Sequence, residues 1–140
     1  LDVSIQAQII ELLIGLQKDF GLSMLFISHD LSVVREISHR VMVLYLGRIV
    51  ELADRESIYT DARHPYTKAL ISAVPIPDPE IEKTRERLKL TGDLPSPLDS
   101  RAQLRFMKSK VIDDPDAEQY RPQLIEVSPG HWVAEHDPVG

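Results

Sequence analysis

The chain has 140 residues, a length typical of one domain or of part of a larger one. Its formal net charge of −6 argues against sequence-independent electrostatic binding to nucleic acid, so no nucleic-acid partner is expected. The absence of cysteine from the sequence excludes a disulfide framework, a thiolate metal site and a cysteine nucleophile. The apolar runs fall well short of the roughly 20 residues that span a bilayer.

The N-terminal third has the pattern of an α/β protein. Apolar residues recur at helical spacing over residues 3–20, and Gly21 follows as a stop signal, so we expect a helix there. Asp2 is placed to cap this helix. Residues 23–28, with the apolar run 24–27 at their centre, are typical of a strand buried in a parallel sheet, and residues 31–38 predict a second helix.

A hairpin and further helices are expected next. Two β-rich runs, residues 40–46 and 48–52, are separated by Gly47, which is typical of a tight antiparallel hairpin. A short helix is expected over about residues 54–59. Another is expected over residues 64–73, with a proline at its first helical position, where the missing amide costs nothing.

The composition shifts in the C-terminal half. Residues 75–100 are rich in proline and include the charged run 80–89, so we expect a linker or surface arm there. Beyond it, residues 116–120 predict a helix. Two strand candidates, residues 123–127 and 131–135, complete what we expect to be a small appendage.

Ser28, His29 and Asp30 directly follow the apolar run and precede the second predicted helix. A strand that turns into a helix presents side chains at the carboxyl edge of a sheet, where α/β proteins place their chemistry. On the residues alone, a histidine satisfied at a strand end is the simpler interpretation of His29, and a histidine that contacts phosphate is the alternative.

Several segments, in this order, resemble the ATP-binding subunits of ABC transporters, specifically the branch that serves dipeptide, oligopeptide and nickel importers. Residues 1–8 (Leu-Asp-Val-Ser-Ile-Gln-Ala-Gln) resemble the D-loop segment, and residues 26–31 (Phe-Ile-Ser-His-Asp-Leu) resemble the H-loop. Residues 43–51 resemble the hairpin after it. The segments that resemble the C-terminal extension of peptide importers are residues 64–70, 74–79 and 94–98. The resemblance is strong to about residue 98 and weaker beyond.

This resemblance implies an α/β fold. It would be the C-terminal part of a P-loop NTPase (ABC ATPase) sheet ending in an antiparallel hairpin, followed by a proline-rich extension and a small α+β tail. Residues 1–60 would complete the nucleotide-binding domain, residues 61–98 would be the peptide-importer extension, and residues 99–140 would be a tail without cysteines.

The resemblance also implies hydrolysis of ATP, with Mg²⁺, in the complete subunit. His29 corresponds to the H-loop histidine and is the expected catalytic residue, reaching the γ-phosphate and the attacking water. Asp2, as the D-loop aspartate, and Ser28 join it as the expected nucleotide-binding and dimer-interface residues. A helix cap is the simpler interpretation of Asp2 on the residues alone, and the two roles are compatible.

Other motifs of an ABC ATPase are missing from the sequence. It contains no Gly-x-x-x-x-Gly-Lys-Ser/Thr loop, no Leu-Ser-Gly-Gly-Gln signature and no Walker B carboxylate pair. We therefore expect no ATP or Mg²⁺ binding and no hydrolysis by this chain alone. Because Leu1 is not methionine, we expect the C-terminal part of a longer subunit. The alternative is a stand-alone regulatory or interaction remnant without nucleotide chemistry.

The expected partners are a second ATP-binding subunit and transmembrane permease subunits, at the cytoplasmic face of the cell membrane. Family members commonly carry cysteines in the tail that can hold an iron–sulfur cluster, and without them no such cluster is expected here. The potential metal ligands of the tail fit no strong template, so we expect solvated surface and no metal. These residues are His131, His136, Asp113, Asp114 and Asp116.

Overall fold

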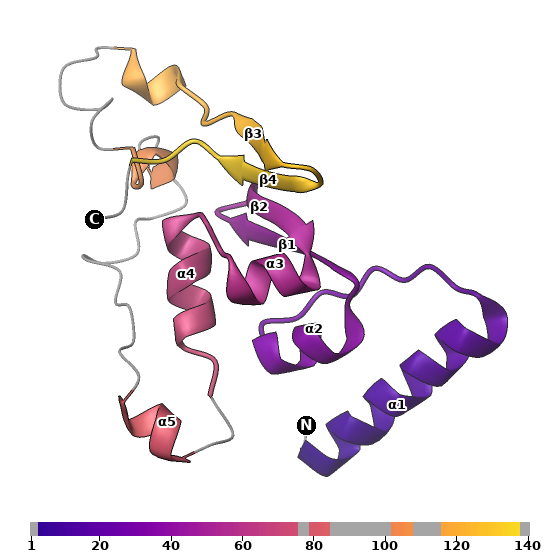
Figure 1. The fold of residues 1–140 in the computed structure, drawn as a ribbon. Helices are drawn as coiled ribbons and strands as arrows, with labels where there is room; N and C mark the ends of the chain where they lie inside the picture. Colours follow the sequence, from indigo (N-terminus) through magenta and orange to yellow (C-terminus); the bar gives the residue numbers. More distant parts are fainter. Residues whose placement is uncertain (1–2, 76–78, 85–101, 108–115, 138–140) are drawn as a thin grey trace. The chain divides into compact units, whose positions relative to one another are not determined.

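A computed structural model of the chain describes residues 3–75, 79–84, 102–107 and 116–137. The chain divides into two compact units, residues 1–39 and residues 40–140 (Figure 1). Asp2 and residues 94–98 lie outside the described residues, as do Asp113 and Asp114.

The first unit contains two helices, α1 (Val3–Phe20) and α2 (Leu31–Ile37), which contact each other. Both helices were predicted from the spacing of their apolar residues. Gly21 adopts a φ of +60°, a left-handed conformation that glycine tolerates without steric cost, and α1 ends before it. The buried side chains come from both helices, and they are Ile10, Val33, Val34 and Ile37.

The prediction of a strand over residues 23–28 is wrong. These residues form no strand, and the side chains of Leu25 and Ile27 are 89% and 86% exposed. A strand needs a neighbour to pair with its backbone amides and carbonyls, and the described part of this unit offers no other strand. The expected parallel sheet is therefore not present among the described residues.

The second unit is built on a four-stranded antiparallel sheet with the order β1-β2-β4-β3 (Figure 1). The strands are β1 (Arg40–Tyr45), β2 (Arg48–Asp54), β3 (Leu124–Ser128) and β4 (His131–Ala134). The predicted hairpin of β1 and β2 is confirmed, and Gly47 occupies its turn at a φ of +76°. The two predicted C-terminal strands also form. Because β4 pairs with β2, they extend the sheet of the hairpin.

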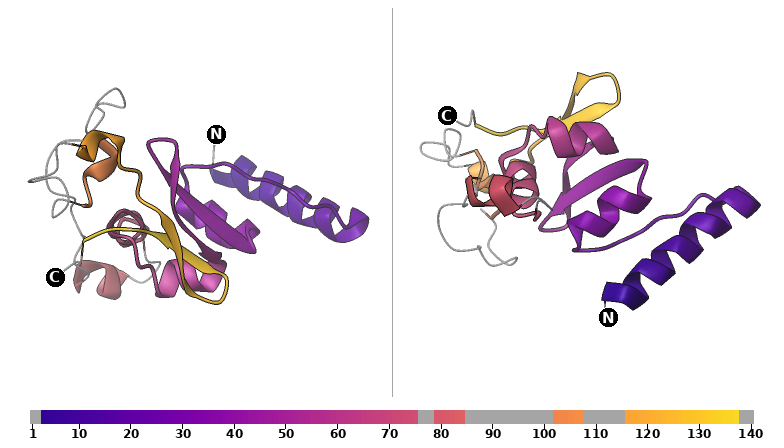
Figure 2. Two further views of the ribbon diagram at one scale, coloured as in Figure 1. Left: turned by 90° about the horizontal axis from the view of Figure 1, so that it is seen from above. Right: turned by 60° about the horizontal axis from the view of Figure 1, so that its bottom comes forward.

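Helices contact the sheet. They are α3 (Arg55–Thr60) and α4 (Pro65–Ser72). The described residues of this unit also form α5 (Pro79–Thr84) and the 3₁₀ turns Ala102–Leu104 and Ala117–Gln119. α3 contacts both strands of the hairpin and α4 contacts β2 (Figure 2). Alternate residues of β1 are buried, as expected for a strand with one covered face, and Ile58 of α3 is 1% exposed.

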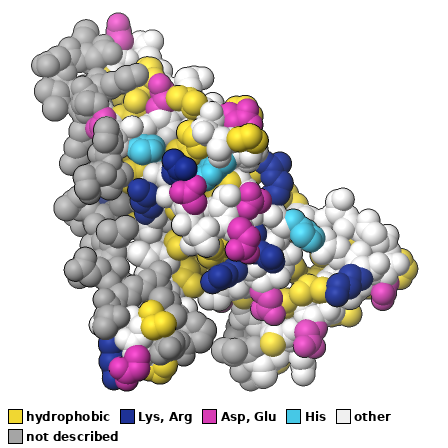
Figure 3. Space-filling view, in the orientation of Figure 1, with side chains coloured by type: hydrophobic (Ala, Val, Ile, Leu, Met, Phe, Trp, Pro, Cys, Tyr) yellow, Lys and Arg dark blue, Asp and Glu magenta, His cyan; other side chains and the backbone are white. Residues whose placement is uncertain are grey.

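Most charged side chains of the described residues are not buried. On the face shown in Figure 3, acidic and basic side chains of the described residues are intermingled, with apolar side chains between them. Only a few charged groups are withdrawn from water, and among the described residues Glu51 is the carboxylate that is fully buried, at 0% exposure. Its burial requires partners within the second unit that replace water.

Candidate functional site

The Ser28-His29-Asp30 segment forms a polar turn before α2. The Asp30 backbone N–H donates to the Ser28 hydroxyl oxygen at 3.0 Å. One carboxylate oxygen of Asp30 accepts from the backbone N–H groups of Ser32 at 3.0 Å and Val33 at 3.3 Å, which caps α2. The backbone on the C-terminal side of His29 is thus fixed, while the His29 side chain is exposed.

Asp30 also bonds to α1. The Gln6 side-chain N–H₂ donates to the second carboxylate oxygen of Asp30 at 3.2 Å. The hydrogen bond from Gln6, followed by that from the Val33 N–H, lowers the pKa of Asp30 below its ordinary value. Asp30 therefore holds a negative charge beside His29 at neutral pH.

An open hollow of about 410 Å³ lies beside this turn. Ser28, His29 and Asp30 provide its polar side, and Gln6 lies among them. The remaining lining is apolar, from Ile9, Ile10, Leu13, Phe26 and Val33. Two of the expected site residues, Ser28 and His29, therefore lie together at one hollow. The third, Asp2, is outside the described residues.

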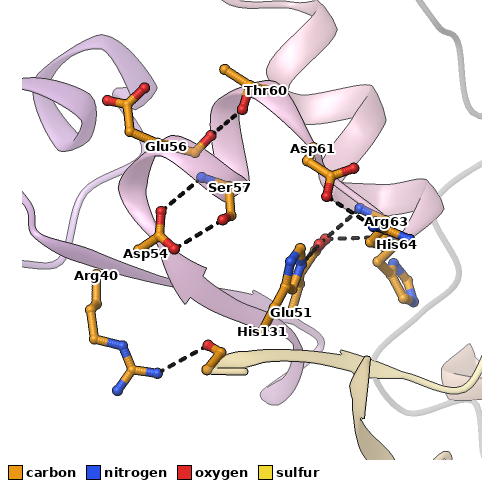
Figure 4. A network of polar contacts seen from close by, with 11 residues as sticks. Arg40, Glu51, Asp54, Glu56, Ser57, Thr60, Asp61, Arg63, His64 and His131 are labelled. Atoms are coloured by element: carbon orange, nitrogen blue, oxygen red, sulfur yellow. Dashed lines mark hydrogen bonds and ion pairs between the residues drawn. The ribbon is translucent and has the colours of Figure 1, made fainter. Parts of the chain in front are cut away.

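A second polar centre, in the other unit, was not expected from the sequence (Figure 4). The buried carboxylate of Glu51 on β2 has three hydrogen-bond partners. Two are the backbone N–H groups of Arg63 at 2.8 Å and His64 at 3.1 Å, and the third is the His131 ring Nε2 at 2.7 Å. One carboxylate thus ties together β2, the connection before α4 and the start of β4.

The expectation that His131 lies on the solvated surface is wrong. Its side chain is buried and pairs with Glu51. Its partner is 80 residues away in the sequence, so no local pattern reveals the pair. The available signal is Glu51 itself, a charged residue inside the β-rich run 48–52, which the structure buries beside Val50.

His64 begins α4, as its position before Pro65 predicts. Its ring Nδ1 accepts from the Tyr66 backbone N–H at 3.1 Å, which caps the helix. The ring packs edge-on against Phe106 at 4.9 Å between centroids, and against His136 at 5.3 Å. Burial, with a smaller contribution from His136, lowers the pKa of His64 from 6.5 to about 3. The ring is therefore neutral at physiological pH, as its acceptor role requires.

The low pKa of His64 predicts a loss of stability in acid. Between pH 6.5 and about 3 the unfolded chain binds a proton that the folded ring does not, so the free energy of unfolding falls as the pH is lowered through this range. His64→Asn keeps a helix cap but removes this proton. We expect the opening free energy of α4, measured by hydrogen exchange, to fall less steeply below pH 6.5 in this variant. Equal slopes in the two proteins would contradict a neutral, buried His64.

The chain is similar in sequence to known proteins. Residues 50–103 match the family described as "Oligopeptide/dipeptide transporter, C-terminal region". The chain is 49% identical over 136 residues to YkfD of Bacillus subtilis, covering 97% of this chain and 41% of that protein. It is 51% and 50% identical over 134 residues to the oligopeptide transport ATP-binding proteins OppF of Salmonella typhimurium and Escherichia coli, covering 96% of this chain and 40% of each.

The chain is a relative of the oligopeptide transport ATP-binding proteins. The resemblance to ATP-binding subunits of peptide ABC transporters is thereby confirmed. The chain spans about two fifths of the length of the curated relatives that it matches. Glu51 and His64 lie inside the matched C-terminal region, and His131 lies beyond it.

Across the described ranges, no three His, Asp or Glu side chains gather into a group that could hold a metal ion. The Mg²⁺ that the resemblance implies belongs to the complete subunit, and these described residues do not supply a set of ligands for it. No helix in the described part of the chain combines the length and apolar character needed to cross a membrane.

Proposed function

We propose that this chain is part of the ATP-binding, ATP-hydrolysing subunit of an ABC importer of peptides. The observation that carries the proposal is the identity of about 50%, over almost the whole chain, to proteins named for oligopeptide transport and ATP binding. The exposed histidine at a hollow, on a turn fixed by hydrogen bonds, supports it. ATP would be the substrate, and its hydrolysis would drive peptide uptake.

In this proposal His29 acts on the γ-phosphate. Transfer of a phosphoryl group to water depends on positioning and on stabilising charge, with little covalent chemistry for the protein. One imidazole nitrogen of His29 donates to a γ-phosphate oxygen, and its ring orients the attacking water. Ser28 and Asp2 belong to the same nucleotide site or to the interface with a second ATP-binding subunit. The Asp30 carboxylate stays outside the phosphate contacts, because it is an anionic acceptor like the phosphate, and its oxygens accept from Gln6 and the α2 amides.

The proposed assembly follows from the same function. Permease subunits in the membrane carry the peptide, and the ATP-binding subunit lies against them at the cytoplasmic face. We propose that residues 1–60 complete the nucleotide-binding domain, residues 61–98 form the peptide-importer extension, and residues 99–140 form its tail. This chain supplies no phosphate-cradling glycine-rich loop, so hydrolysis requires further segments of the subunit.

The direct test is ATP hydrolysis by the full-length subunit that contains these residues, purified with its permease partners. We expect nucleotide binding and hydrolysis, together with ATP-dependent uptake of labelled oligopeptide into proteoliposomes. A full-length protein that binds no nucleotide would contradict the proposal. It would favour the alternative, a regulatory or interaction module that keeps the C-terminal region of the family.

A further inference from the structure

A hydrogen bond joins helix α1 to the turn that carries His29. Gln6 lies near the start of α1, and its side-chain amide donates to Asp30 at 3.2 Å across 24 residues of sequence. Most other side chains around the hollow are apolar. Among the residues of α1 that line the hollow, Gln6 is the polar one, and its side-chain amide bonds to the residue directly after His29.

The other hydrogen bonds of the turn are local. Ser28 accepts from the Asp30 N–H, and Asp30 accepts from the first amides of α2, so these bonds fix the turn to α2. None of these bonds reaches α1. The Gln6 bond does, because it links the carboxylate that caps α2 to the neighbouring helix.

We propose that Gln6 is a positioning residue for His29. Its bond to Asp30 holds the Ser28-His29-Asp30 turn in a fixed position relative to α1. The inference rests on the proposed function, in which His29 contacts the γ-phosphate. Catalysis of this kind is sensitive to displacements of about 1 Å, so loss of a single anchoring bond lowers the rate of the chemical step. In this role Gln6 acts through Asp30 and not by contacting the reacting atoms.

The charge on Asp30 fits this role. The bond from Gln6 is the largest cause of the lowered pKa of Asp30, so the amide donor favours the ionised carboxylate. Hydrogen bonds to charged groups are stronger than those between neutral partners. The groups that face Asp30 are Gln6 from α1, the amides of Ser32 and Val33 from α2, and His29 from the turn.

The test compares two Gln6 variants with a matched control in the full-length subunit. Gln6→Leu keeps the approximate size of the side chain and removes the donor, whereas Gln6→Glu places a second carboxylate against Asp30. Gln8→Leu makes the same change at an exposed position of the same helix. For Gln6→Leu we expect kcat for ATP hydrolysis to fall about tenfold with KM for ATP unchanged, and for Gln8→Leu we expect both to stay at wild-type values.

The pH profile of Gln6→Glu separates positioning from general damage to the fold. When it is protonated, the carboxyl group that this substitution introduces donates to Asp30 as the amide does. The activity of Gln6→Glu relative to wild type should therefore rise as the pH falls from about 8 to about 5.5. A pH-independent ratio, or wild-type kcat in Gln6→Leu, would overturn the inference.

The His29→Ala variant distinguishes the two proposals. If His29→Ala abolishes turnover while Gln6→Leu is fully active, the positioning role is wrong and the proposed function stands. If His29→Ala hydrolyses ATP normally, His29 has no role in the reaction, and the positioning role of Gln6 is then wrong as well. In the His29→Ala background, Gln6→Leu should cause no further loss of residual activity, because Gln6 acts through His29.

Discussion

Replacing Glu51 with alanine is expected to weaken the second unit by about 3 to 5 kcal/mol, the largest effect on stability that we predict for a single substitution. The carboxylate is fully buried and accepts hydrogen bonds from three partners on two other segments, the connection before α4 and the start of β4 (Figure 4). Its removal leaves two backbone N–H groups and the His131 ring without their acceptor. Buried donors that lose their partners retain the full cost of desolvation.

Hydrogen exchange measured by mass spectrometry locates this effect. In Glu51→Ala we expect exchange in β4 and in residues 61–66 to speed up by roughly 100-fold or more, since each 1.4 kcal/mol is a factor of about ten. Exchange in α1 should not change, because it belongs to the other unit. Glu56→Ala is the matched control. Glu56 is exposed on α3, and its side chain forms a surface ion pair with the neighbouring Arg55, so little change is expected.

Two further variants show how the carboxylate works. Glu51→Gln keeps the shape but turns one acceptor oxygen into a donor, which then faces one of its three donors, so we expect an intermediate loss. His131→Ala should cost less than Glu51→Ala, because the amides of Arg63 and His64 keep their acceptor. Wild-type exchange rates in β4 of both Glu51→Ala and His131→Ala would contradict the role of this pair.

The substitution His29→Ala is expected to lower ATP turnover of the full-length subunit by at least about 100-fold, the size of effect seen when a positioned catalytic group is removed. Affinity for ATP should stay close to that of wild type, because His29 is proposed to contact only the γ-phosphate and the water. The His29 side chain is exposed, so its loss should leave the fold intact.

His39→Ala provides the matched control for that experiment. His39 is an exposed histidine that follows α2, and the same substitution there removes a ring of the same kind without touching the hollow. We expect wild-type turnover in His39→Ala. Equal turnover in His29→Ala and wild type would remove His29 from the mechanism.

Elements whose signals are local were predictable from the sequence. The apolar spacing of α1, the glycine in the hairpin turn and the helix starts at Asp54 and His64 all depend on a few neighbouring residues, and the structure has each of them. Asp54, for example, accepts from the Ser57 N–H at 2.9 Å to start α3. Such signals need no knowledge of distant chain segments.

Features that depend on distant partners were not predictable. The run 23–28 has the composition of a buried strand, but its state depends on neighbouring strands, which the described residues of its unit do not contain. His131 is buried because the register of β4 on β2 brings it to Glu51, and that register is set by pairing between segments 80 residues apart. The Gln6 bond to Asp30 likewise depends on how α1 meets α2.

Chemical footprinting of the histidines tests the central claim most directly. Diethyl pyrocarbonate modifies exposed imidazoles, so in the full-length subunit His29 and His39 should react, and the buried His64 and His131 should react slowly. We predict that a non-hydrolysable ATP analogue protects His29 and not His39, whereas ADP, which lacks the γ-phosphate, protects neither. Equal labelling of His29 with and without the saturating ATP analogue would contradict a γ-phosphate contact and, with it, the proposed role of this chain in ATP hydrolysis.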